Sequence, residues 1–423
     1  MRRALRWVAV ALVAMLAWAA LVGADAWFGW SRAPIAARGD AQAFFEAAAS
    51  RIDREHRGNA ILVVIEQGRV VGVHDQTIGA PVNDDTLFQV ASLSKWVTAW
   101  GVMTLVEQGE IDLDAPVSRY LTRWRLPDSP YNEQVTVRRI LSHTAGFTDG
   151  LGYGGFLPDA PVQTLEESLT AAGDAAYGAN GVLRVGREPG SWQYSGGGYT
   201  LLQLLIEEIS GEPFNDYMRR AVLAPLGMHG STFVLDDASR TRVAEFYDTD
   251  GARAPHYAYT ATAAASLYTS AADLTRFVEA QAQGAQGEPA GRGVLRPETL
   301  ALMAQPEAAL LGAPFWGLGM TLYGRDASGG FLIGHDGGNR PAINTTVRTN
   351  PETGDGIIVL LTGNVRLASE LGGEWTFWKA GVTDVYGLMA ARNALLMRLL
   401  AGWAVIVVVA LALWWRGRRA RSA

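Results

Sequence analysis

Ser92 and Lys95 are the pair of residues in this sequence whose types and spacing best fit a chemical role. In a helix that begins at Ser92, the two side chains occupy positions i and i+3 and share one face. A serine hydroxyl becomes a strong nucleophile when a neighbouring base takes its proton. A lysine amine can be that base when burial lowers its pKa. The pair therefore predicts a nucleophilic serine; the alternative is a helix-capping serine followed by a solvated lysine.

The amino-acid composition favours the chemical interpretation of Lys95. The chain of 423 residues has 36 basic residues, of which only Lys95 and Lys379 are lysines, so a surface cation here is nearly always arginine. Arginine cannot lose its proton, whereas a buried lysine can. The formal net charge of -6 provides no basic excess for binding nucleic acid. The absence of cysteine excludes disulfides, thiolate catalysis and cysteine metal ligands.

Two further segments carry side chains that could act near Ser92. Tyr194 stands just before three consecutive glycines and a helical pattern, and could carry protons if an ammonium group lay nearby. His335-Asp336-Gly337-Gly338 follows a strand-like segment, and its glycines would let a backbone N–H line a pocket. The alternatives are a buried tyrosine in a glycine-rich turn and an ordinary turn after a strand. The remaining histidines lack metal-ligand spacing, so no metal site or cofactor is predicted.

The elements that must position these residues follow from hydrophobic periodicity. Helical patterns cover residues 41–57, 92–108 and 199–210, and the last two end at a glycine. Two apolar runs flank Gln67-Gly68 as in a β-hairpin. Four short strands are predicted near the end, at residues 317–323, 331–334, 343–349 and 357–362. Strands at both ends of the body, with helices between them, indicate one sheet with an inserted helical region.

The first 26 residues form a membrane-targeting segment. Three arginines in the first six residues precede an uncharged apolar run from Trp7 to Ala24. At about 1.5 Å per helical residue, this run nearly spans a hydrocarbon core. It is either an uncleaved signal anchor or a signal peptide with a small-residue cleavage site at Ala24-Asp25-Ala26.

A second uncharged run, from Leu399 to Trp415, ends in two tryptophans and is followed by four arginines. Basic residues that flank membrane segments stay in the cytoplasm. Both termini are therefore predicted to be cytoplasmic if the first segment is not cleaved, with the body outside the inner membrane, in the periplasm of a two-membrane bacterium. The predicted divisions are 1–26 signal anchor or signal peptide, 27–392 body, 393–415 transmembrane helix and 416–423 basic cytoplasmic tail.

The motifs together resemble the serine β-lactamase and penicillin-binding-protein superfamily, and within it class C β-lactamases, D-Ala-D-Ala carboxypeptidases and related esterases. Their order is S-x-x-K, then Y-x-N, then K-T-G or H-x-G. This sequence has Ser92 and Lys95, then Tyr194, then His335 and Gly337. The resemblance covers about residues 40–380, and further segments typical of the subgroup are residues 109–116, 141–147 and 223–228.

The resemblance implies an α+β fold, with an antiparallel sheet flanked by helices and an inserted all-helical subdomain. It implies acyl transfer in which Ser92 attacks a carbonyl while Lys95 and Tyr194 move protons. The backbone N–H groups of Ser92 and Gly338 would stabilise the oxyanion, and His335 and Gly337 would contact the substrate. The expected partners are a small-molecule or peptide acyl substrate and the membrane, with no nucleic acid.

Two departures from the family pattern bear on the substrate. Gly196 stands where the family's Y-x-N motif has asparagine, and His335 stands where K-T-G has lysine. Histidine carries less charge than lysine at neutral pH, so recognition of a substrate carboxylate is expected to be weaker. Both changes favour an esterase, peptidase or amidase over an efficient β-lactamase. The alternative function is a non-catalytic, membrane-anchored sensor that binds penicillin or another ligand in the same pocket.

Overall fold

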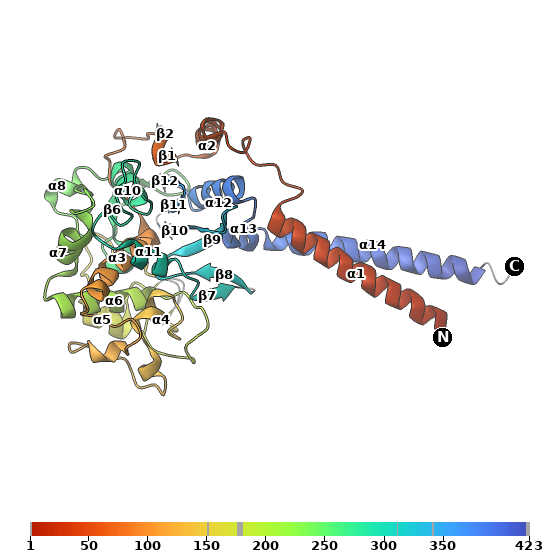
Figure 1. The fold of residues 1–423 in the computed structure, drawn as a ribbon, viewed down its shortest axis with the longest axis horizontal. Helices are drawn as coiled ribbons and strands as arrows, with labels where there is room; N and C mark the ends of the chain where they lie inside the picture. Colours follow the sequence, from red (N-terminus) through yellow and green to blue (C-terminus); the bar gives the residue numbers. More distant parts are fainter. Residues whose placement is uncertain (1, 150–151, 176–180, 311, 341, 420–423) are drawn as a thin grey trace.

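The body of the protein is built on one eight-stranded antiparallel sheet, from which two long terminal helices extend together (Figure 1). The computed structural model describes residues 2–149, 152–175, 181–310, 312–340 and 342–419. The strand order is β2-β1-β12-β11-β10-β9-β8-β7, so strands from both ends of the body meet at the β1–β12 pair. The predicted α+β fold, with a sheet formed from both ends of the chain, is confirmed.

The helices are α1 (Arg2–Phe28), α2 (Ala41–Glu55), α3 (Ser94–Glu107), α4 (Val137–Leu141), α5 (Leu165–Ala171), α6 (Gly196–Ser210), α7 (Phe214–Met218), α8 (Asp237–Arg240), α9 (Thr262–Ala265), α10 (Ala271–Glu279), α11 (Pro297–Met303), α12 (Leu367–Ala380), α13 (Val385–Ala390) and α14 (Arg392–Arg419). Short 3₁₀ turns include η1 (Ala91–Leu93), η2 (Val117–Arg119) and η3 (Asn132–Gln134), and η5 (Arg219–Leu223) is a π-helical turn. The strands are β1 (Ala60–Glu66), β2 (Arg69–Gln76), β3 (Phe88–Gln89), β4 (Phe246–Tyr247), β5 (Arg253–Ala254), β6 (Tyr268–Thr269), β7 (Ala308–Leu310), β8 (Ala313–Trp316), β9 (Thr321–Arg325), β10 (Phe331–Asn339), β11 (Ile343–Asn350) and β12 (Asp355–Thr362).

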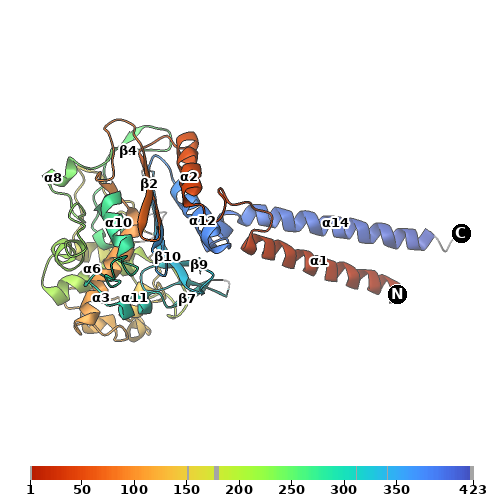
Figure 2. The same cartoon turned by 45° about the horizontal axis from the view of Figure 1, so that its top comes forward.

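The sheet is covered on both faces, as Figure 2 shows from a second angle. Helices α2 and α12 pack on one face, while α10 and the inserted helices pack on the other. Strand β1 is apolar throughout because its alternate side chains enter two different cores. Leu62 and Val64 belong to the core under α2 and α12, whereas Ile61 and Val63 belong to the larger core beneath the helical region.

The helical region lies between β2 and β7, as the sequence predicts, and α3 crosses its interior. All but the last two residues of α3 are buried, which explains why this helix lacks a polar face. Helix α6 packs beside it and ends at Gly211, whose φ of 69° is the left-handed conformation that favours glycine at a helix end.

Predicted boundaries differ from the structure near all three motifs: the helix predicted from residue 199 begins at Gly196. The helix predicted from Ser92 begins at Ser94, because Ser92 lies in the preceding 3₁₀ turn η1. The strand predicted to stop at Gly334 continues to Asn339, so the His335–Gly338 motif is part of β10 and pairs with β11 instead of forming a turn. Hydrophobic periodicity misses this continuation because the motif is polar and glycine-rich.

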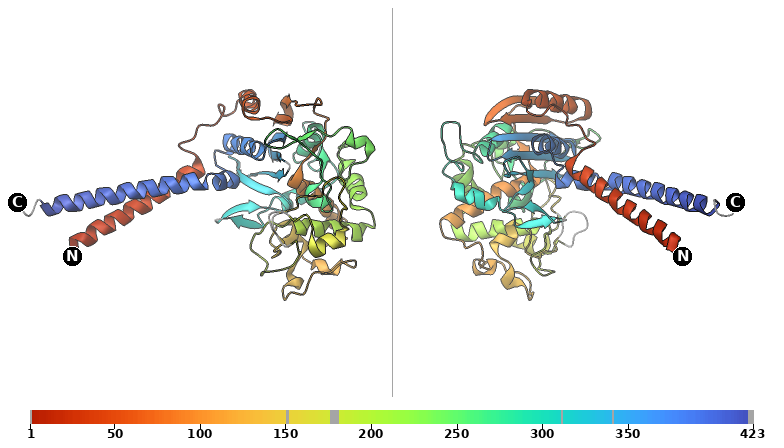
Figure 3. Two further views of the ribbon diagram at one scale, coloured as in Figure 1. Left: turned by 180° about the vertical axis from the view of Figure 1, so that it is seen from behind. Right: turned by 45° about the vertical axis from the view of Figure 1, so that its right-hand side comes forward.

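The terminal helices α1 and α14 lie side by side and antiparallel, with both chain ends at the tip farthest from the body (Figure 3). The Trp18 indole donates to the carbonyl oxygen of Arg398 at 3.2 Å, and the Arg398 guanidinium pairs with Asp25 at 2.8 Å. Residues 6–28 and 392–416 are long and apolar enough to cross a membrane, and the 18-residue windows within them have mean hydropathies of 2.2 and 2.4. The last four residues of the predicted tail, 420–423, lie outside the described residues.

Candidate active site

A strained turn presents Ser92 at the surface of the site. Ala91, directly before it, has a φ of 47°, which a residue with a side chain seldom adopts and which is typical of functional turns. Ser94 holds this turn in place: its hydroxyl donates to the carbonyl oxygen of Ala91 at 2.6 Å and accepts the N–H of Leu267 at 2.9 Å. Ser92 stays partly exposed, whereas its neighbours are buried.

Lys95 reaches back from the first turn of α3 to Ser92. Its Nζ atom lies 3.2 Å from Ser92 Oγ and donates to the carbonyl oxygen of Ala264, in α9, at 2.6 Å. The side chain is 1% exposed. Burial lowers the pKa of Lys95 to about 7, although the carboxylate of Asp149 opposes the shift. A substantial fraction of the Lys95 amine is therefore neutral near pH 7.

Tyr194 completes a cluster of three functional groups. Its hydroxyl is hydrogen-bonded to the side chain of Ser92, and the centre of its ring lies 5.0 Å from Lys95 Nζ. Burial raises the pKa of Tyr194 above its usual value, opposed by the bond from Ser92. Tyr194 is thus held protonated in the unliganded protein, where it can relay a proton between neighbouring groups.

His143 packs against the ring of Tyr194, and no role was assigned to it from the sequence. Its ring centre lies 4.3 Å from that of Tyr194 and 4.9 Å from that of Trp316. The backbone N–H of Ser195 donates to His143 Nδ1 at 3.1 Å. Burial and the charge of Lys95 keep the pKa of His143 well below its usual value, so its ring is neutral. The signal in the sequence was the 141–147 segment, which contains this residue.

Asp149 fixes the start of α6, and with it the chain direction after Tyr194. One of its oxygens accepts the Ser195 hydroxyl at 2.6 Å, and the other accepts the N–H of Gly197 at 2.7 Å. Burial raises the pKa of Asp149 while these hydrogen bonds lower it. A carboxylate at the amino end of a helix is also favoured by the helix dipole.

The third motif brings β10 against the turn that holds Ser92. A β-carbon at Gly337 would lie 2.0 Å from the carbonyl oxygen of Val90, two residues before Ser92, so only glycine permits this approach. Gly338 follows on the same strand and is exposed. The structure therefore brings Ser92, Lys95, Tyr194 and the glycines of the third motif to one place.

His335 lies beside the cluster as a neutral, buried side chain. It is 2% exposed, and its Nδ1 atom lies 2.6 Å from the carbonyl oxygen of Asp336, which makes Nδ1 the donor. Its Nε2 atom has no hydrogen-bond partner among the described residues. Burial and the charge of Lys95 lower the pKa of His335 to about 3. His335 therefore offers no positive charge at neutral pH.

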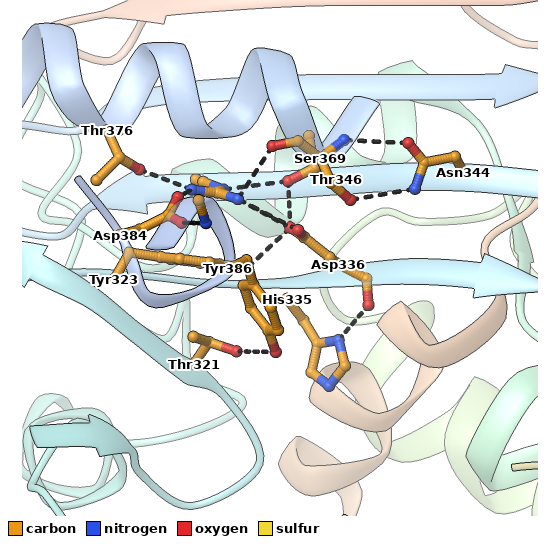
Figure 4. A network of polar contacts seen from close by, with 12 residues as sticks. Thr321, Tyr323, His335, Asp336, Asn344, Thr346, Ser369, Thr376, Asp384 and Tyr386 are labelled. Carbon is orange, nitrogen blue, oxygen red and sulfur yellow. Dashed lines mark hydrogen bonds and ion pairs between the residues drawn. The ribbon is translucent and has the colours of Figure 1, made fainter. Parts of the chain in front are cut away.

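Asp336 anchors the same strand from the opposite face of the sheet (Figure 4). Its carboxylate accepts hydrogen bonds from Tyr323 at 2.8 Å and from Thr346 at 2.5 Å, and it pairs with Arg348 at 3.2 Å. Arg348 is fully buried and also pairs with Asp384, the residue before α13. Loss of one partner from such a buried pair typically costs about 3–5 kcal/mol, so this network fixes the strand that carries the third motif.

Two residues singled out in the sequence take no part in the cluster. Lys379 is ion-paired with Glu66 and Asp355, at 2.6 and 2.8 Å. Gly196 packs closely against Tyr153: a β-carbon there would lie 3.0 Å from the Tyr153 ring, so a side chain at this position would require the ring to shift. Tyr153 therefore occupies the space beside the second motif. Among the described residues, no group of three or more acidic, histidine or cysteine side chains could hold a metal ion.

Comparison with known proteins gives consistent matches. The family model described as Beta-lactamase matches residues 43–375. Penicillin-binding protein 4 of Amycolatopsis lactamdurans is 31% identical, over 70% of this chain and 77% of that protein. Esterase EstB of Burkholderia gladioli is 31% identical, over 69% of this chain and 80% of that protein. The structure of the octameric penicillin-binding protein homologue from Pyrococcus abyssi aligns with a TM-score of 0.64 at 24% identity, covering 81% of this chain and 78% of that one.

Proposed function

This chain belongs to the Beta-lactamase family, and on that premise we propose that it is a membrane-anchored serine hydrolase that acts through an acyl-enzyme. The observation that carries the proposal is the buried amine of Lys95, with a pKa of about 7, lying 3.2 Å from Ser92 Oγ. A base is most effective when its pKa lies near the working pH. Similarity to both a penicillin-binding protein and an esterase supports the same reaction class.

The proposed reaction has two halves. Ser92 Oγ attacks the substrate carbonyl carbon while its proton passes to the neutral amine of Lys95. The N–H groups of Ser92 and Gly338 stabilise the negative oxygen that forms. The leaving group departs with a proton relayed through Tyr194, which leaves an ester on Ser92. Water then attacks the carbonyl carbon of that ester and passes a proton through Lys95 and Tyr194 to Ser92 Oγ. The bond between Ser92 Oγ and the acyl group breaks, and the acid product is released.

We propose uncharged esters as the preferred substrates. A substrate carboxylate gains most from a nearby cation in a buried site, and His335 is neutral there. The ring of Tyr153 packs against Gly196, so the side of the site next to the second motif is aromatic. EstB, a relative named as an esterase, is 31% identical to this chain, the same identity as penicillin-binding protein 4.

The test compares two esters that differ in one group. The full chain in detergent is given 4-nitrophenyl valerate and the 4-nitrophenyl monoester of glutaric acid, in which a carboxylate replaces the terminal methyl. After subtraction of the buffer rate, we expect kcat/KM for valerate to be at least tenfold higher. A fluorescent penicillin followed by intact mass is expected to leave no lasting adduct. A long-lived adduct without ester turnover would instead support the non-catalytic sensor.

Ester hydrolysis is expected to depend on pH through Lys95. Only the unprotonated amine can accept the Ser92 proton, and its pKa is about 7. Below that pKa, kcat/KM should fall about tenfold per pH unit, and above it the rate should level off. Because His335, with a pKa of about 3, stays neutral over this range, a single inflection is expected. A flat profile between pH 5 and 9 would contradict Lys95 as the base.

We also propose that α1 stays attached and that both chain ends are cytoplasmic, with the body on the other side of the membrane. Packing of α1 against α14 supports an uncleaved anchor, since Trp18 and Asp25 both bond to Arg398. The carbonyl oxygen of Trp27 also accepts the N–H of Thr383, beside α13. The two chain ends lie at the same end of the helix pair, as they must if both are on the cytoplasmic side of the membrane (Figure 1).

A further inference from the structure

A cavity of about 650 Å³ lies between the body and the two terminal helices. Its walls come from the end of α1, the β7–β8 hairpin, β9, α13 and the first two turns of α14. Residues from each side include Val22, Gly23, Phe315, Leu388 and Leu396. The volume lies within the range of about 300–1,000 Å³ that is usual for pockets that enclose a small ligand.

The lining of this cavity suits a hydrocarbon chain. It consists almost entirely of aliphatic and aromatic residues, and Arg392 is the charged residue among the described ones that line it. The Arg392 side chain forms no hydrogen bond or ion pair with another residue in the described part of the chain. An apolar pocket with one unpaired cation at its edge fits an amphiphile that has an alkyl chain and an anionic head.

The cavity lies at the boundary where the two membrane helices meet the body. Its lining includes residues between Ala19 and Trp27 of α1, but not Leu21, and residues between Arg392 and Leu399 of α14. These are the ends of the two candidate spans nearest the body. Trp27, an aromatic residue of the kind that favours the membrane interface, is part of the wall. At this depth the molecules available to fill an apolar space are lipids.

The cavity is distinct from the active site, although the two share a wall. Its lining includes neither Ser92 nor Tyr194. Phe315 lines the cavity and lies 5.9 Å from the ring of Tyr386, which belongs to α13. Phe315 also lies 5.0 Å from the ring of Trp192, two residues before Tyr194. These aromatic rings separate the cavity from the catalytic cluster.

We propose that this cavity binds an alkyl chain of an anionic membrane phospholipid, with the lipid phosphate paired to Arg392. The proposal rests on the membrane anchoring proposed above and not on the hydrolytic reaction. The lipid fills the gap between body and anchor, so that α13 and the β7–β8 hairpin pack on a defined ligand. This would set the body at a fixed height over the bilayer.

Photolabelling of the full chain in vesicles tests the proposal. The vesicles are phosphatidylcholine with a small fraction of phosphatidylglycerol that carries a diazirine in one chain. We expect labelling of residues 385–399 to exceed labelling of residues 405–413, which include the exposed Val405 and Val408 of α14, at least fivefold. This preference should fall at least threefold when the probe is phosphatidylcholine with the same diazirine-bearing acyl chain. It should fall as much when the phosphatidylglycerol probe is used with Arg392→Gln.

A variant that fills the cavity supplies the matched comparison. A β-carbon at Gly23 has no other heavy atom within 4 Å, so Gly23→Trp can place its ring in the cavity without a backbone clash. This variant should lose at least fivefold of the labelling in residues 385–399. The control Leu21→Trp, at a site 55% exposed and outside the cavity lining, should keep it. Leu396→Trp fills the cavity from α14 and should lose the same labelling. Agreement between the two variants shows that the loss in Gly23→Trp does not come from a local defect in α1.

Three results would overturn the proposal. Equal labelling of residues 385–399 and 405–413 in the unaltered protein would mean contact with the bulk bilayer only. Labelling that survives both Gly23→Trp and Leu396→Trp would place the lipid elsewhere. Failure of the protein to float with vesicles would remove the membrane anchor and this site together. None of these readouts depends on ester hydrolysis, so they are separate from failure of the proposed enzyme activity.

Discussion

Replacement of Ser92 by alanine is expected to abolish covalent labelling by a fluorophosphonate and to lower ester hydrolysis about 10⁴-fold or more. The hydroxyl removed is the group that lies 3.2 Å from the Lys95 amine and is hydrogen-bonded to Tyr194. Because Ser92 is partly exposed, the change should leave the fold intact. Intact mass after labelling and the rate of 4-nitrophenyl valerate hydrolysis measure the two effects.

Ser94→Ala is the matched control for this experiment. Ser94 lies two residues away, but its buried hydroxyl bonds to the backbone at Ala91 and Leu267 instead of facing the substrate. Loss of such a buried hydrogen bond typically costs about 1–3 kcal/mol of stability. Ser94→Ala should therefore melt at a lower temperature and still take the label. Labelling that persists in Ser92→Ala and disappears in Ser94→Ala would show that the nucleophile is misassigned.

Lys95→Arg is expected to lower kcat about 10²–10⁴-fold while it preserves the positive charge. A guanidinium keeps its proton at all relevant pH values, so it cannot accept the one from Ser92. Rates of ester hydrolysis at pH 8, above the Lys95 pKa of about 7, measure the loss. Activity in Lys95→Arg near that of the unaltered protein would remove Lys95 from the role of base.

Lys95→Met separates the chemical role of the lysine from its effect on stability. The folded-state pKa of about 7 lies below the unfolded value of about 10.4. Between these values the unfolded chain binds a proton that the folded chain does not, so the free energy of unfolding decreases as pH falls. At pH 7 the cost is of order 4 kcal/mol. Lys95→Met should thus be inactive but more stable at pH 7, with the stability gain shrinking towards pH 10.5.

The sequence predicted the strands of the sheet that have a clear local apolar pattern, but it missed β7 and β8 and placed β9 at residues 317–323 instead of Thr321–Arg325. The hairpin around Gln67-Gly68 follows from two apolar runs and a turn whose residues both have positive φ in the structure, 51° and 69°. The extension of β10 through His335–Gly338 was missed, since polar residues and glycines carry little strand signal. That stretch is held by pairing with β11 and by the bonds of Asp336 to Arg348 and Tyr323, which are distant in sequence.

The candidate site was predicted in part. Ser92, Lys95 and Tyr194 were selected from their motifs, and the structure brings all three together. His143 and Asp149 were not selected, although the 141–147 segment that contains His143 was noted as typical of the subgroup. Each acts by contacting the segment that begins at Tyr194, about 50 residues away, and spacing along the chain does not show that contact.

By itself, the sequence determined which side chains could do chemistry, the order of the motifs and the two apolar terminal helices, since these follow from residue type and spacing. Tertiary structure decided which of the two lysines lies beside the nucleophile. Lys379 pairs with Glu66 and Asp355, whereas Lys95 is buried, donates to Ala264, and pairs with no carboxylate of the described residues. It also decided that His335 is neutral, because burial next to a second cation disfavours its charged form. Charge state depends on what surrounds a group in space, which spacing along the chain does not contain.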